Sequence, residues 1–427
     1  MNPLILSTSD IDGGAARAAY RLHQSLQNDG INSQMLVRTK YSVGKAVIAY
    51  KPLLAKLGPS LDELPLQLYP NRKRKMYSLQ WSPDAIATKV AQIDPDLINL
   101  HWFCNGYLRI ETIAKFNKPI VWTLHDMWAF TGGCHYSEQC DRYIQSCGAC
   151  PQLDSRKNWD LSRWVWQRKL KAWQNLNLTI VTPSVWLAER AKSSSLFKNL
   201  RVEVIPHGLD TENYKPIERQ VARKLLNLPQ DKQLILFGAS SGAMNDLRKG
   251  FHLLYPALQN LSTGWQERVE LVIFGASQPD NPVELGFNVR YLGRLHDDVA
   301  LALVYSAADV TIVPSMQEAY GQTASESIAC GTPVVAFDIT GLKDIVAHQQ
   351  DGYLAQPFAV DDLERGIAWV LADSDRHQEL CDRARSKAEQ EFTLKLQACR
   401  YLSLFTELVE DWHKSTGKDK SLQAISR

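Results

Sequence analysis

The feature that most constrains the fold of this 427-residue chain is a unit that recurs along nearly all of it. Each unit has a short apolar run, a turn with Gly, Asp or Ser, and a longer segment of helical period. This alternation is typical of doubly wound α/β domains with parallel sheets. Five strands are predicted in each half: Leu4–Thr8, Leu97–Leu100, Ile120–Leu124, Thr179–Thr182 and Val202–Ile205, then Leu234–Phe237, Leu271–Phe274, Val289–Leu292, Val310–Val313 and Val334–Phe337. We therefore predict two Rossmann-like domains that face a central cleft.

The boundary between the domains is predicted near Pro206, where the alternating pattern restarts. The first domain then covers residues 1–205 and the second 206–393. An amphipathic helix is predicted at 394–412 and is expected to pack back on the first domain. Residues 413–427 are polar and are expected to form a tail.

Charge and hydropathy exclude several classes of protein. A formal net charge of +2 gives no global attraction to nucleic acid, so none is expected as a partner. The first apolar run, residues 3–6, is short and has no charged leader, which does not fit a secretory signal. No run of 18 apolar residues occurs, so no membrane-spanning helix is expected. These features predict a cytoplasmic protein whose membrane contacts, if it has any, are peripheral.

The strongest motif follows the predicted strand Val310–Val313. Glu318 and Glu326 are separated by seven residues, with Gly321 between them at a junction from strand to helix. A helix start near Thr323 places Glu326 in the first turn and leaves the amides of Gly321, Gln322 and Thr323 exposed to an anion such as a diphosphate. A simpler interpretation of Glu326 is a capping box with Thr323.

This motif, with the Gly-Thr-Pro-Val-Val that follows it at 331–335, resembles glycosyltransferase family 4, and the resemblance covers nearly the whole chain. It implies a GT-B fold and transfer of a sugar from a nucleotide diphosphate donor with retention of configuration. It also implies that Glu318 contacts donor sugar hydroxyls and that Glu326 binds the ribose. Carboxylate oxygens suit both roles because they accept hydrogen bonds from hydroxyls.

Two further markers lie in the first domain. Gly13-Gly14 opens an Ala-rich helix after the first strand, where glycine allows close approach to a ligand and the helix start offers amides. An ordinary loop is the alternative for a Gly-Gly turn. His125 and Asp126 follow the strand that ends at Leu124, where the family places an active-site histidine that touches the transferred sugar. We expect Asp126 to orient the ring of His125, and His101 to line the same cleft.

Arg248-Lys249-Gly250 follows the predicted strand Leu234–Phe237. The resemblance assigns Lys249 to the donor phosphates, which form the leaving group. The family also has an arginine upstream, but this chain has Gly238-Ala239-Ser240-Ser241-Gly242 there. Arg248 is predicted to supply that second positive charge, and a solvated basic turn is the alternative.

Four cysteines, Cys134, Cys140, Cys147 and Cys150, fall within 17 residues directly after the His125-Asp126 pair. Four thiolates close a tetrahedron around zinc, so a structural zinc site in the 134–150 loop is one interpretation. Free or redox-active thiols and disulfides are the others. No cofactor is expected for catalysis.

The acceptor is not specified by the motifs. Resemblance to capsule and exopolysaccharide transferases implies a saccharide or lipid-linked acceptor. The basic and aromatic segments 71–77 and 163–173 fit either core packing or contact with a membrane surface. A GT-B sugar-nucleotide epimerase or hydrolase, and a sugar-nucleotide-binding protein without catalysis, stay open as alternatives to a hexosyltransferase.

Overall fold

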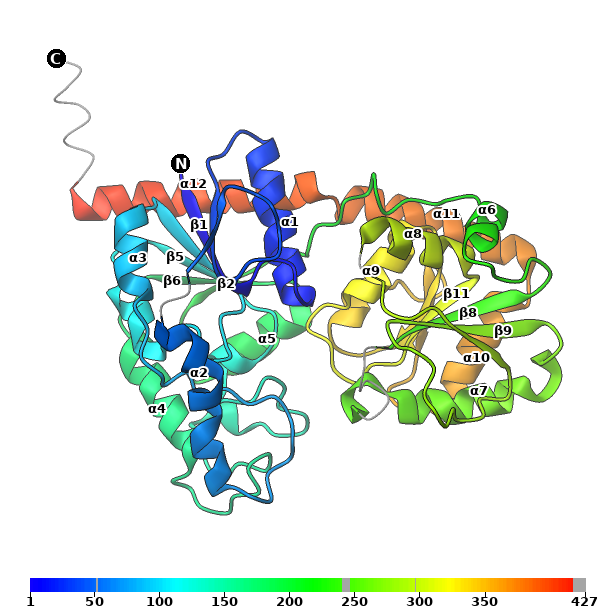
Figure 1. Ribbon diagram of the computed structural model, residues 1–427, viewed down its shortest axis with the longest axis horizontal. Coiled ribbons are helices and arrows are strands. Elements are labelled where there is room, and N and C mark those ends of the chain that lie inside the picture. The colour runs from blue at the N-terminus through cyan, green and yellow to red at the C-terminus, as the bar shows by residue number, and fades with distance from the viewer. Residues whose placement is uncertain (51–52, 240–245, 296, 418–427) are drawn as a thin grey trace. The chain divides into compact units, whose positions relative to one another are not determined.

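The computed structural model describes residues 1–50, 53–239, 246–295 and 297–417 (Figure 1). They form two compact units. Unit 1 contains residues 1–206 together with the C-terminal segment from 397 onward. Unit 2 contains residues 207–396.

The sheet of unit 1 is parallel and has seven strands in the order β3-β2-β1-β4-β5-β6-β7. The strands are β1 (Pro3–Ser9), β2 (Gln34–Thr39), β3 (Val47–Ala49), β4 (Leu97–Leu100), β5 (Ile120–Thr123), β6 (Leu178–Thr182) and β7 (Arg201–Val204). The central strands β4, β5 and β6 are buried along their whole length, as expected for a parallel sheet covered on both faces.

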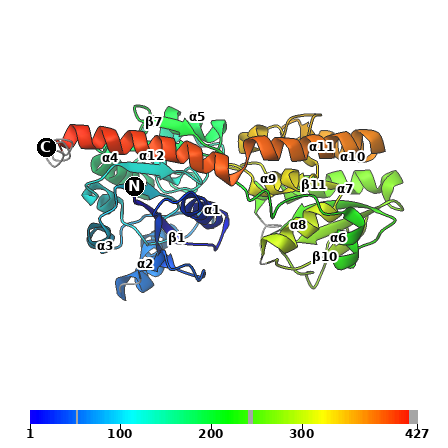
Figure 2. The same cartoon turned by 90° about the horizontal axis from the view of Figure 1, so that it is seen from above.

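Helices cover the sheet of unit 1. They are α1 (Gly14–Asn28), α2 (Leu53–Glu63), α3 (Ile86–Ile93), α4 (Leu161–Trp173), α5 (Val185–Ser193) and α12 (Leu394–Thr416). Asp160 caps α4, because its carboxylate accepts from the amides of Ser162 and Arg163. The small side chains of Ala18 and Ala19 let α1 lie close to the strands. Helix α12 runs along unit 1 (Figures 1 and 2). Its buried side chains, including Tyr401, Leu404 and Phe405, share a core with α1, β2, β5 and β6.

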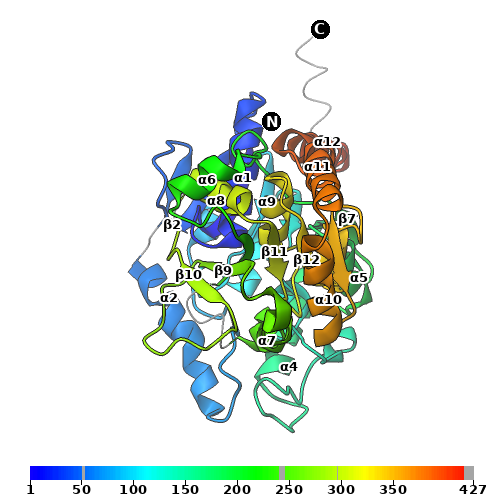
Figure 3. The same cartoon turned by 90° about the vertical axis from the view of Figure 1, so that its right-hand side faces the viewer.

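The sheet of unit 2 is parallel and has six strands in the order β10-β9-β8-β11-β12-β13. The strands are β8 (Gln233–Gly238), β9 (Val269–Phe274), β10 (Asn288–Tyr291), β11 (Val310–Val313), β12 (Val334–Phe337) and β13 (Gly352–Ala355). The helices are α6 (Arg219–Leu225), α7 (Phe251–Trp265), α8 (Asp298–Ala307), α9 (Gln322–Ala329), α10 (Val360–Leu371) and α11 (Ser374–Glu391). One core lies between the strands and α6, α8, α9 and α11, and a second lies between the strands and α7 and α10 (Figure 3).

The predicted fold class is confirmed, since each unit is a parallel α/β layer structure. All ten predicted strands are present, but β2, β3 and β13 were not predicted. These three lie at or next to the sheet edges, and each contains residues that are not fully buried, so their apolar runs are interrupted.

The C-terminal helix is longer than predicted. It continues to Thr416, so residues 413–416 belong to α12 and not to a polar tail. Residues 418–427, the rest of that predicted tail, lie outside the described part of the chain. Within that described part, none of the helices combines the length and the apolar character needed to cross a bilayer.

Candidate functional site

The carboxyl ends of β8 and β11, neighbouring strands of unit 2, carry the first group of candidate residues. Glu318 lies in the loop after β11, and Lys249 lies in the short helix η5 (Leu247–Lys249) after β8. The backbone amide of Met316 donates to the carbonyl of Arg248 over 2.7 Å, which ties the two loops together. Ligands of open α/β sheets bind at this edge, so the tertiary structure places these residues where a ligand is expected.

Charge compensation organises what we call the Glu318 cluster, formed by Glu318, Lys249, Arg248 and Ser315. Lys249 Nζ donates to Glu318 Oε1 over 2.5 Å, and the Ser315 hydroxyl donates to the same oxygen over 3.0 Å. Arg248 Nη1 lies 3.7 Å from Oε1 and donates to the carbonyl of Gln317 over 2.9 Å. Burial by itself raises the pKa of Glu318, but the charges of Lys249 and Arg248 outweigh it and lower that pKa below its usual value. Glu318 is therefore ionised at neutral pH.

Glycine is required at the end of η5. Gly250 has φ of 72°, and a Cβ built there would lie 1.8 Å from the carbonyl oxygen of Pro314. Any larger side chain would push the Lys249 loop away from the loop that carries Glu318. This explains why glycine follows the lysine in the sequence. Residues 238–242 stand where the family has its upstream arginine. Of these, only Gly238 and Ala239 lie within the described residues.

Helix α9 begins at Gln322, with Gly321 as its N-cap at φ of 115° and no side chain in the capping role. The helix therefore starts one residue before the predicted position, and Thr323 is its second residue. The capping-box interpretation of Glu326 is wrong, because Thr323 is not the N-cap. Instead the buried Glu326 carboxylate accepts from the hydroxyl of Tyr305 over 3.0 Å.

Unit 1 carries the second group, also after parallel strands. Gly13 is the N-cap of α1 with φ of 92°, and Gly13 and Gly14 are both exposed. A Cβ at Gly13 would meet no atom within 4 Å, so the positive φ and not crowding explains this glycine. The loop is held by the buried Asp10, which accepts from the amides of Tyr41 and Ser42.

His101 and His125 follow the neighbouring strands β4 and β5, and the structure brings them together. His101 Nδ1 and His125 Nε2 are 2.9 Å apart, and the other ring nitrogen of His101, Nε2, lies 2.9 Å from Asn99 Oδ1. Burial lowers the pKa of His125 to about 4, although Asp126 beside it acts in the opposite direction. His125 is thus neutral at neutral pH.

The Asp126 carboxylate binds residues other than His125, the ring that it was predicted to orient. Its oxygens accept from Trp102 Nε1 over 2.9 Å and from the amide of Trp128 over 2.8 Å, and Oδ2 lies 2.6 Å from His135 Nδ1. Burial raises the pKa of Asp126, but His135 and these hydrogen bonds outweigh it and lower that pKa. The hydrogen bond that orients the His125 ring runs to His101 and not to Asp126.

Ser78, His135 and Asp126 have the spacing of a hydrolytic triad, since His135 Nε2 lies 3.0 Å from Ser78 Oγ. Ser78 is only 4% exposed, and the cavity beside His125 and Asp126 is lined without it. We therefore interpret this triplet as support for Asp126.

Sequence reasoning missed Asn99, His135 and Ser315. Asn99 had a signal, because it is the polar residue of an otherwise apolar strand, Leu97-Ile98-Asn99-Leu100. Buried polar groups are normally hydrogen-bonded, so a polar side chain within such a strand suggests a network. His135 and Ser315 had no comparable signal in the sequence.

The four clustered cysteines line one small cavity, and its other lining residues include Tyr77, Arg142 and Ser162. All four are free thiols. Burial raises the pKa of Cys134 and Cys150, and raises that of Cys147 to about 12. In the described residues, no group of three or more His, Cys, Asp or Glu side chains is placed so that it could hold a metal ion. A zinc site here stays a prediction, and it would require the thiols to converge.

Asp-x-Asp triplets, which metal-dependent transferases use, occur at residues 10–12, 94–96 and 373–375. Each has a structural partner. Asp10 holds the loop after β2, Asp96 accepts from the amide of Asn2, and Asp373 caps α11.

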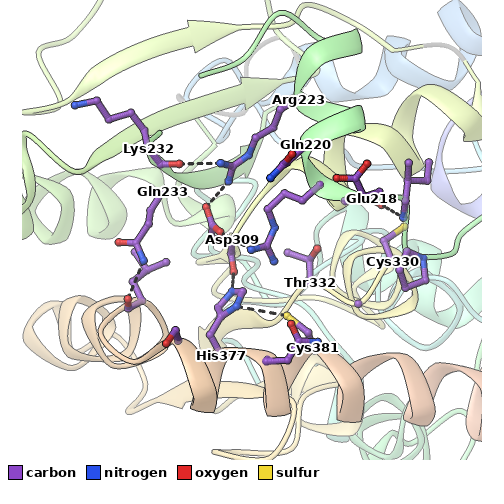
Figure 4. Close-up of a pocket in the computed structure, with 18 of the residues that line it drawn as sticks. Glu218, Gln220, Arg223, Lys232, Gln233, Asp309, Cys330, Thr332, His377 and Cys381 are labelled. Atoms are coloured by element: carbon purple, nitrogen blue, oxygen red, sulfur yellow. Dashed lines mark hydrogen bonds and ion pairs between the residues drawn. The ribbon is translucent and has the colours of Figure 1, made fainter. Parts of the chain in front are cut away.

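A large hollow of about 1360 Å³ lies on unit 2 at the amino ends of its strands, opposite to the edge that carries the Glu318 cluster (Figure 4). At its centre Asp309 pairs with Arg223 over 2.6 Å and with Arg219 over 3.0 Å. His377 Nε2 lies 2.7 Å from the carbonyl of Asp309. These contacts tie α6 and α11 to the start of β11.

Comparison with known proteins agrees with this architecture. Residues 12–213 match the family model described as Glycosyltransferase Family 4, and residues 218–391 match the one described as Glycosyl transferases group 1. The D-inositol 3-phosphate glycosyltransferase of Gordonia bronchialis is 33% identical over 310 residues, which cover 69% of this chain and 62% of that protein. The enzyme of the same name from Xylanimonas cellulosilytica is 34% identical over 209 residues, which cover 44% of this chain and 48% of that protein. The chain thus matches about half to three-fifths of the length of these relatives.

Solved structures show the same fold over nearly the whole chain. Sucrose-phosphate synthase from Thermosynechococcus elongatus has a TM-score of 0.68 at 21% identity and covers 96% of this chain and 100% of its own. Anabaena HepE, solved in complex with UDP and glucose, has a TM-score of 0.63 at 17% identity and covers 95% of this chain and 99% of its own. The chain therefore has the GT-B fold of glycosyltransferases, and its two halves match two glycosyltransferase family models.

Proposed function

We propose that the protein is a glycosyltransferase that moves a sugar from a nucleotide diphosphate sugar to a hydroxyl acceptor, with retention of configuration. The observation that carries this proposal is the Glu318 cluster, in which an ionised carboxylate and two cations lie at the carboxyl edge of unit 2. This edge belongs to the segment that matches the group 1 transferase model.

In this proposal the cluster divides its charges between the two parts of the donor. Glu318, ionised and therefore only an acceptor, binds hydroxyls of the transferred sugar. Lys249 neutralises the donor phosphates, and Arg248 adds charge from a position fixed by its bond to Gln317. The amides of Gly321, Gln322 and Thr323 at the start of α9 face the same diphosphate.

The remaining roles are assigned by the same proposal. Glu326 binds the ribose through its carboxylate, which Tyr305 already holds in place. Gly13 and Gly14 give the donor or the acceptor close access to the backbone at the start of α1. His125 contacts the transferred sugar, and His101 and Asp126 belong to the acceptor side.

The chemistry that follows is front-face transfer. The diphosphate leaves as negative charge builds on its oxygens, and Lys249, Arg248 and the α9 amides stabilise that charge. The acceptor hydroxyl attacks the anomeric carbon from the face that the diphosphate leaves, and its proton passes to the departing diphosphate oxygen, so configuration is retained. No side chain becomes a covalent nucleophile, and no cofactor takes part.

For the donor we propose a UDP sugar before other nucleotide sugars, because HepE was solved with UDP and glucose. For the acceptor we propose a saccharide or lipid-linked saccharide of exopolysaccharide synthesis. The relatives that act on D-inositol 3-phosphate make a polyol phosphate the competing acceptor class.

A thermal-shift screen over UDP, ADP and GDP sugars tests donor binding, because a specific ligand stabilises the folded state by an amount that grows with the logarithm of its concentration over its dissociation constant. The donor that binds is then radiolabelled and incubated with saccharide, lipid-linked and inositol phosphate acceptors. Labelled product that appears only with acceptor, with the donor's anomeric configuration by NMR, supports the proposal. Release of free sugar without acceptor indicates a hydrolase, and epimerised donor indicates an epimerase. Binding without turnover indicates a non-catalytic protein.

A further inference from the structure

Trp102, two residues after the end of β4, is held through both its backbone and its side chain. Its carbonyl accepts from the amide of Thr8 over 2.8 Å, which ties it to β1. Its indole Nε1 donates to Asp126 Oδ2 over 2.9 Å. The indole also packs against the imidazole of His135, with ring centroids 5.7 Å apart and planes inclined by 40°. These contacts fix the orientation of the indole at the carboxyl edge of unit 1.

The groups that hold the indole are themselves fixed. Burial opposes ionisation of Asp126, but His135 and several hydrogen bonds outweigh it and lower that pKa, so the carboxylate can only accept. His135 therefore carries a proton on Nδ1, which lies 2.6 Å from Asp126 Oδ2. The other ring nitrogen of His135, Nε2, lies 3.0 Å from the hydroxyl of Ser78. His135 and Ser78 are at most 4% exposed, so their hydrogen bonds are sheltered from water.

The side chain at the outer end of this network is an aromatic ring. Trp102 is partly exposed, whereas His135 and Ser78 are buried. The only donor of the indole is already bound to Asp126, so the exposed part of the ring offers apolar surface. The small cavity that Trp102 lines with Asp126 has a volume of about 10 Å³, too small for a sugar. A ligand of Trp102 therefore lies on the exposed part of the ring, at the edge where ligands of open α/β sheets bind.

The electronic structure of the ring selects the class of ligand. The face of an aromatic ring carries partial negative charge, which attracts C–H groups and repels phosphate oxygens. A polyhydroxylated six-membered ring has C–H groups on the faces that its equatorial hydroxyls leave uncovered. Saccharides and inositols, the two acceptor classes considered above, share this chemistry. Because the indole is already held in place, a ligand that stacks on it does not have to order it.

We propose that Trp102 binds the acceptor by stacking its indole on a polyhydroxylated six-membered ring, and that Asp126 and His135 are positioning residues that act through Trp102. The proposal rests on the proposed function in calling this ligand the acceptor, but the stacking itself does not require transfer. It gives a purpose to the buried contacts among Ser78, His135 and Asp126, which end at the one partly exposed aromatic ring of the network.

The indole N–H signals of the whole protein report binding directly, by NMR of ¹⁵N-tryptophan-labelled protein. The chain has 12 tryptophans, and a Trp102→Phe spectrum assigns the signal of Trp102. Separate titrations with methyl β-D-glucopyranoside and with myo-inositol should show which of the two rings shifts this signal. UDP, the probe for the donor, should leave it unchanged. A Trp102 signal that moves with neither ring, or with UDP alone, overturns the proposal.

Trp102→Ala tests the stacking. It should weaken binding of the ring about 10-fold, measured by saturation transfer to the C–H protons of the ligand. Trp159→Ala is the matched control, because Trp159 is 71% exposed and lies outside the network around Asp126, and it should bind like the wild type. Equal affinity in Trp102→Ala and Trp159→Ala overturns the proposal.

Asp126→Leu tests the positioning. It keeps the indole but removes the acceptor of its N–H, so binding should weaken although Trp102 is present. Asp126→Asn keeps a side-chain oxygen that can accept and should restore part of the binding. A folded Asp126→Leu protein that binds like the wild type removes Asp126 from the proposal. If this variant does not fold, the comparison of Trp102→Ala with Trp159→Ala decides alone.

Failure of this proposal and failure of the proposed function give different results. Sugar transfer with an unchanged acceptor KM in Trp102→Ala would overturn the stacking and leave the transferase standing. Binding of a ring at Trp102, with no transfer from any donor, would leave a ring-binding site and overturn its assignment to an acceptor.

Discussion

The two units place their candidate residues at the same edge of similar sheets but hold them by different physics. Unit 2 uses charges, with the Glu318 carboxylate ionised between Lys249 and Arg248. Unit 1 uses a buried hydrogen-bonded chain that runs from Asn99 through His101 to His125. The causes of the pKa shifts reflect this difference, since the pKa of Glu318 is lowered by cations that outweigh its burial, whereas that of His125 is lowered by burial itself. The difference teaches that a parallel sheet fixes where a site lies but not how it recognises its ligand.

The largest expected effect comes from removing the charge of unit 2. Glu318→Gln should keep the fold but lower kcat/KM about 10- to 150-fold, because a hydrogen bond to a charged group is worth roughly 1.5–3 kcal/mol. Steady-state kinetics with the identified donor measure this change. Glu379→Gln on the exposed surface of α11 is the control and should behave like the wild type. Wild-type rates in Glu318→Gln would remove this carboxylate from the site.

The cations of unit 2 should affect the diphosphate and not the nucleoside. Lys249→Ala and Arg248→Ala are each expected to weaken nucleotide diphosphate binding by about 1.5–3 kcal/mol, with nucleoside binding unchanged. The two losses should be non-additive, because both cations serve one diphosphate and lie on one carboxylate. Titration calorimetry of both variants and the double variant measures this.

An unchanged diphosphate affinity in Arg248→Ala would leave Arg248 with a structural role, which includes its bonds to Gln317 and Asp246. An unchanged free energy of unfolding in Arg248→Ala would show that any change in binding comes from the lost contact and not from loss of the fold.

Acid should weaken unit 1 through its buried histidines. Burial lowers the pKa of His23 on α1 to about 4, as it does for His125. Below an unfolded pKa near 6.5, the unfolded chain binds protons that the folded unit excludes, so stability falls as pH falls from about 6.5 to 4. The loss is about 2 kcal/mol per histidine at pH 5, since each pKa unit corresponds to about 1.4 kcal/mol. Glu318 of unit 2 acts in the same direction but at lower pH, because its lowered pKa stabilises the folded state above about 4.5 and this contribution is lost as pH falls further.

Hydrogen exchange of unit 1 between pH 7 and 5 checks this window. His23→Gln should reduce the acid loss, while His252→Gln at an exposed position of α7 should leave it unchanged. Equal acid sensitivity in both variants would show that His23 is not the source.

The smallest effect on transfer is expected from chelation. Elemental analysis of protein purified under reducing conditions should find about one zinc per chain, bound by the four cysteines of residues 134–150. Transfer should nevertheless persist in excess EDTA, because the proposed diphosphate site uses side-chain cations and amides. Protein without metal but with four titratable thiols contradicts the zinc prediction. Activity that is lost in EDTA and restored by magnesium or manganese contradicts the proposed diphosphate site.

How much of the site could be predicted depends on how local each contact is. The Glu318-to-Glu326 spacing and the Arg248-Lys249-Gly250 turn lie in short segments, and the structure places both at the carboxyl edge of unit 2. The prediction that Asp126 orients His125 was wrong, because adjacency in the sequence does not decide which way two side chains after a strand point. Asp126 binds His135, nine residues away, and His125 binds His101, which follows the neighbouring strand.

The sequence by itself determined the α/β class, ten strands and the positions of residues that follow those strands, because apolar runs and turn residues act over a few positions. The tertiary structure alone decided which polar side chains meet. Asn99 reaches Val121 and Thr123 because β4 and β5 pair in register, with Asn99 beside Val121. Tyr401 reaches Thr123 only because α12 packs on that sheet, 278 residues further along the chain. Contacts of this kind follow from strand order and helix docking, which are set by burial of whole faces and not by any local pattern.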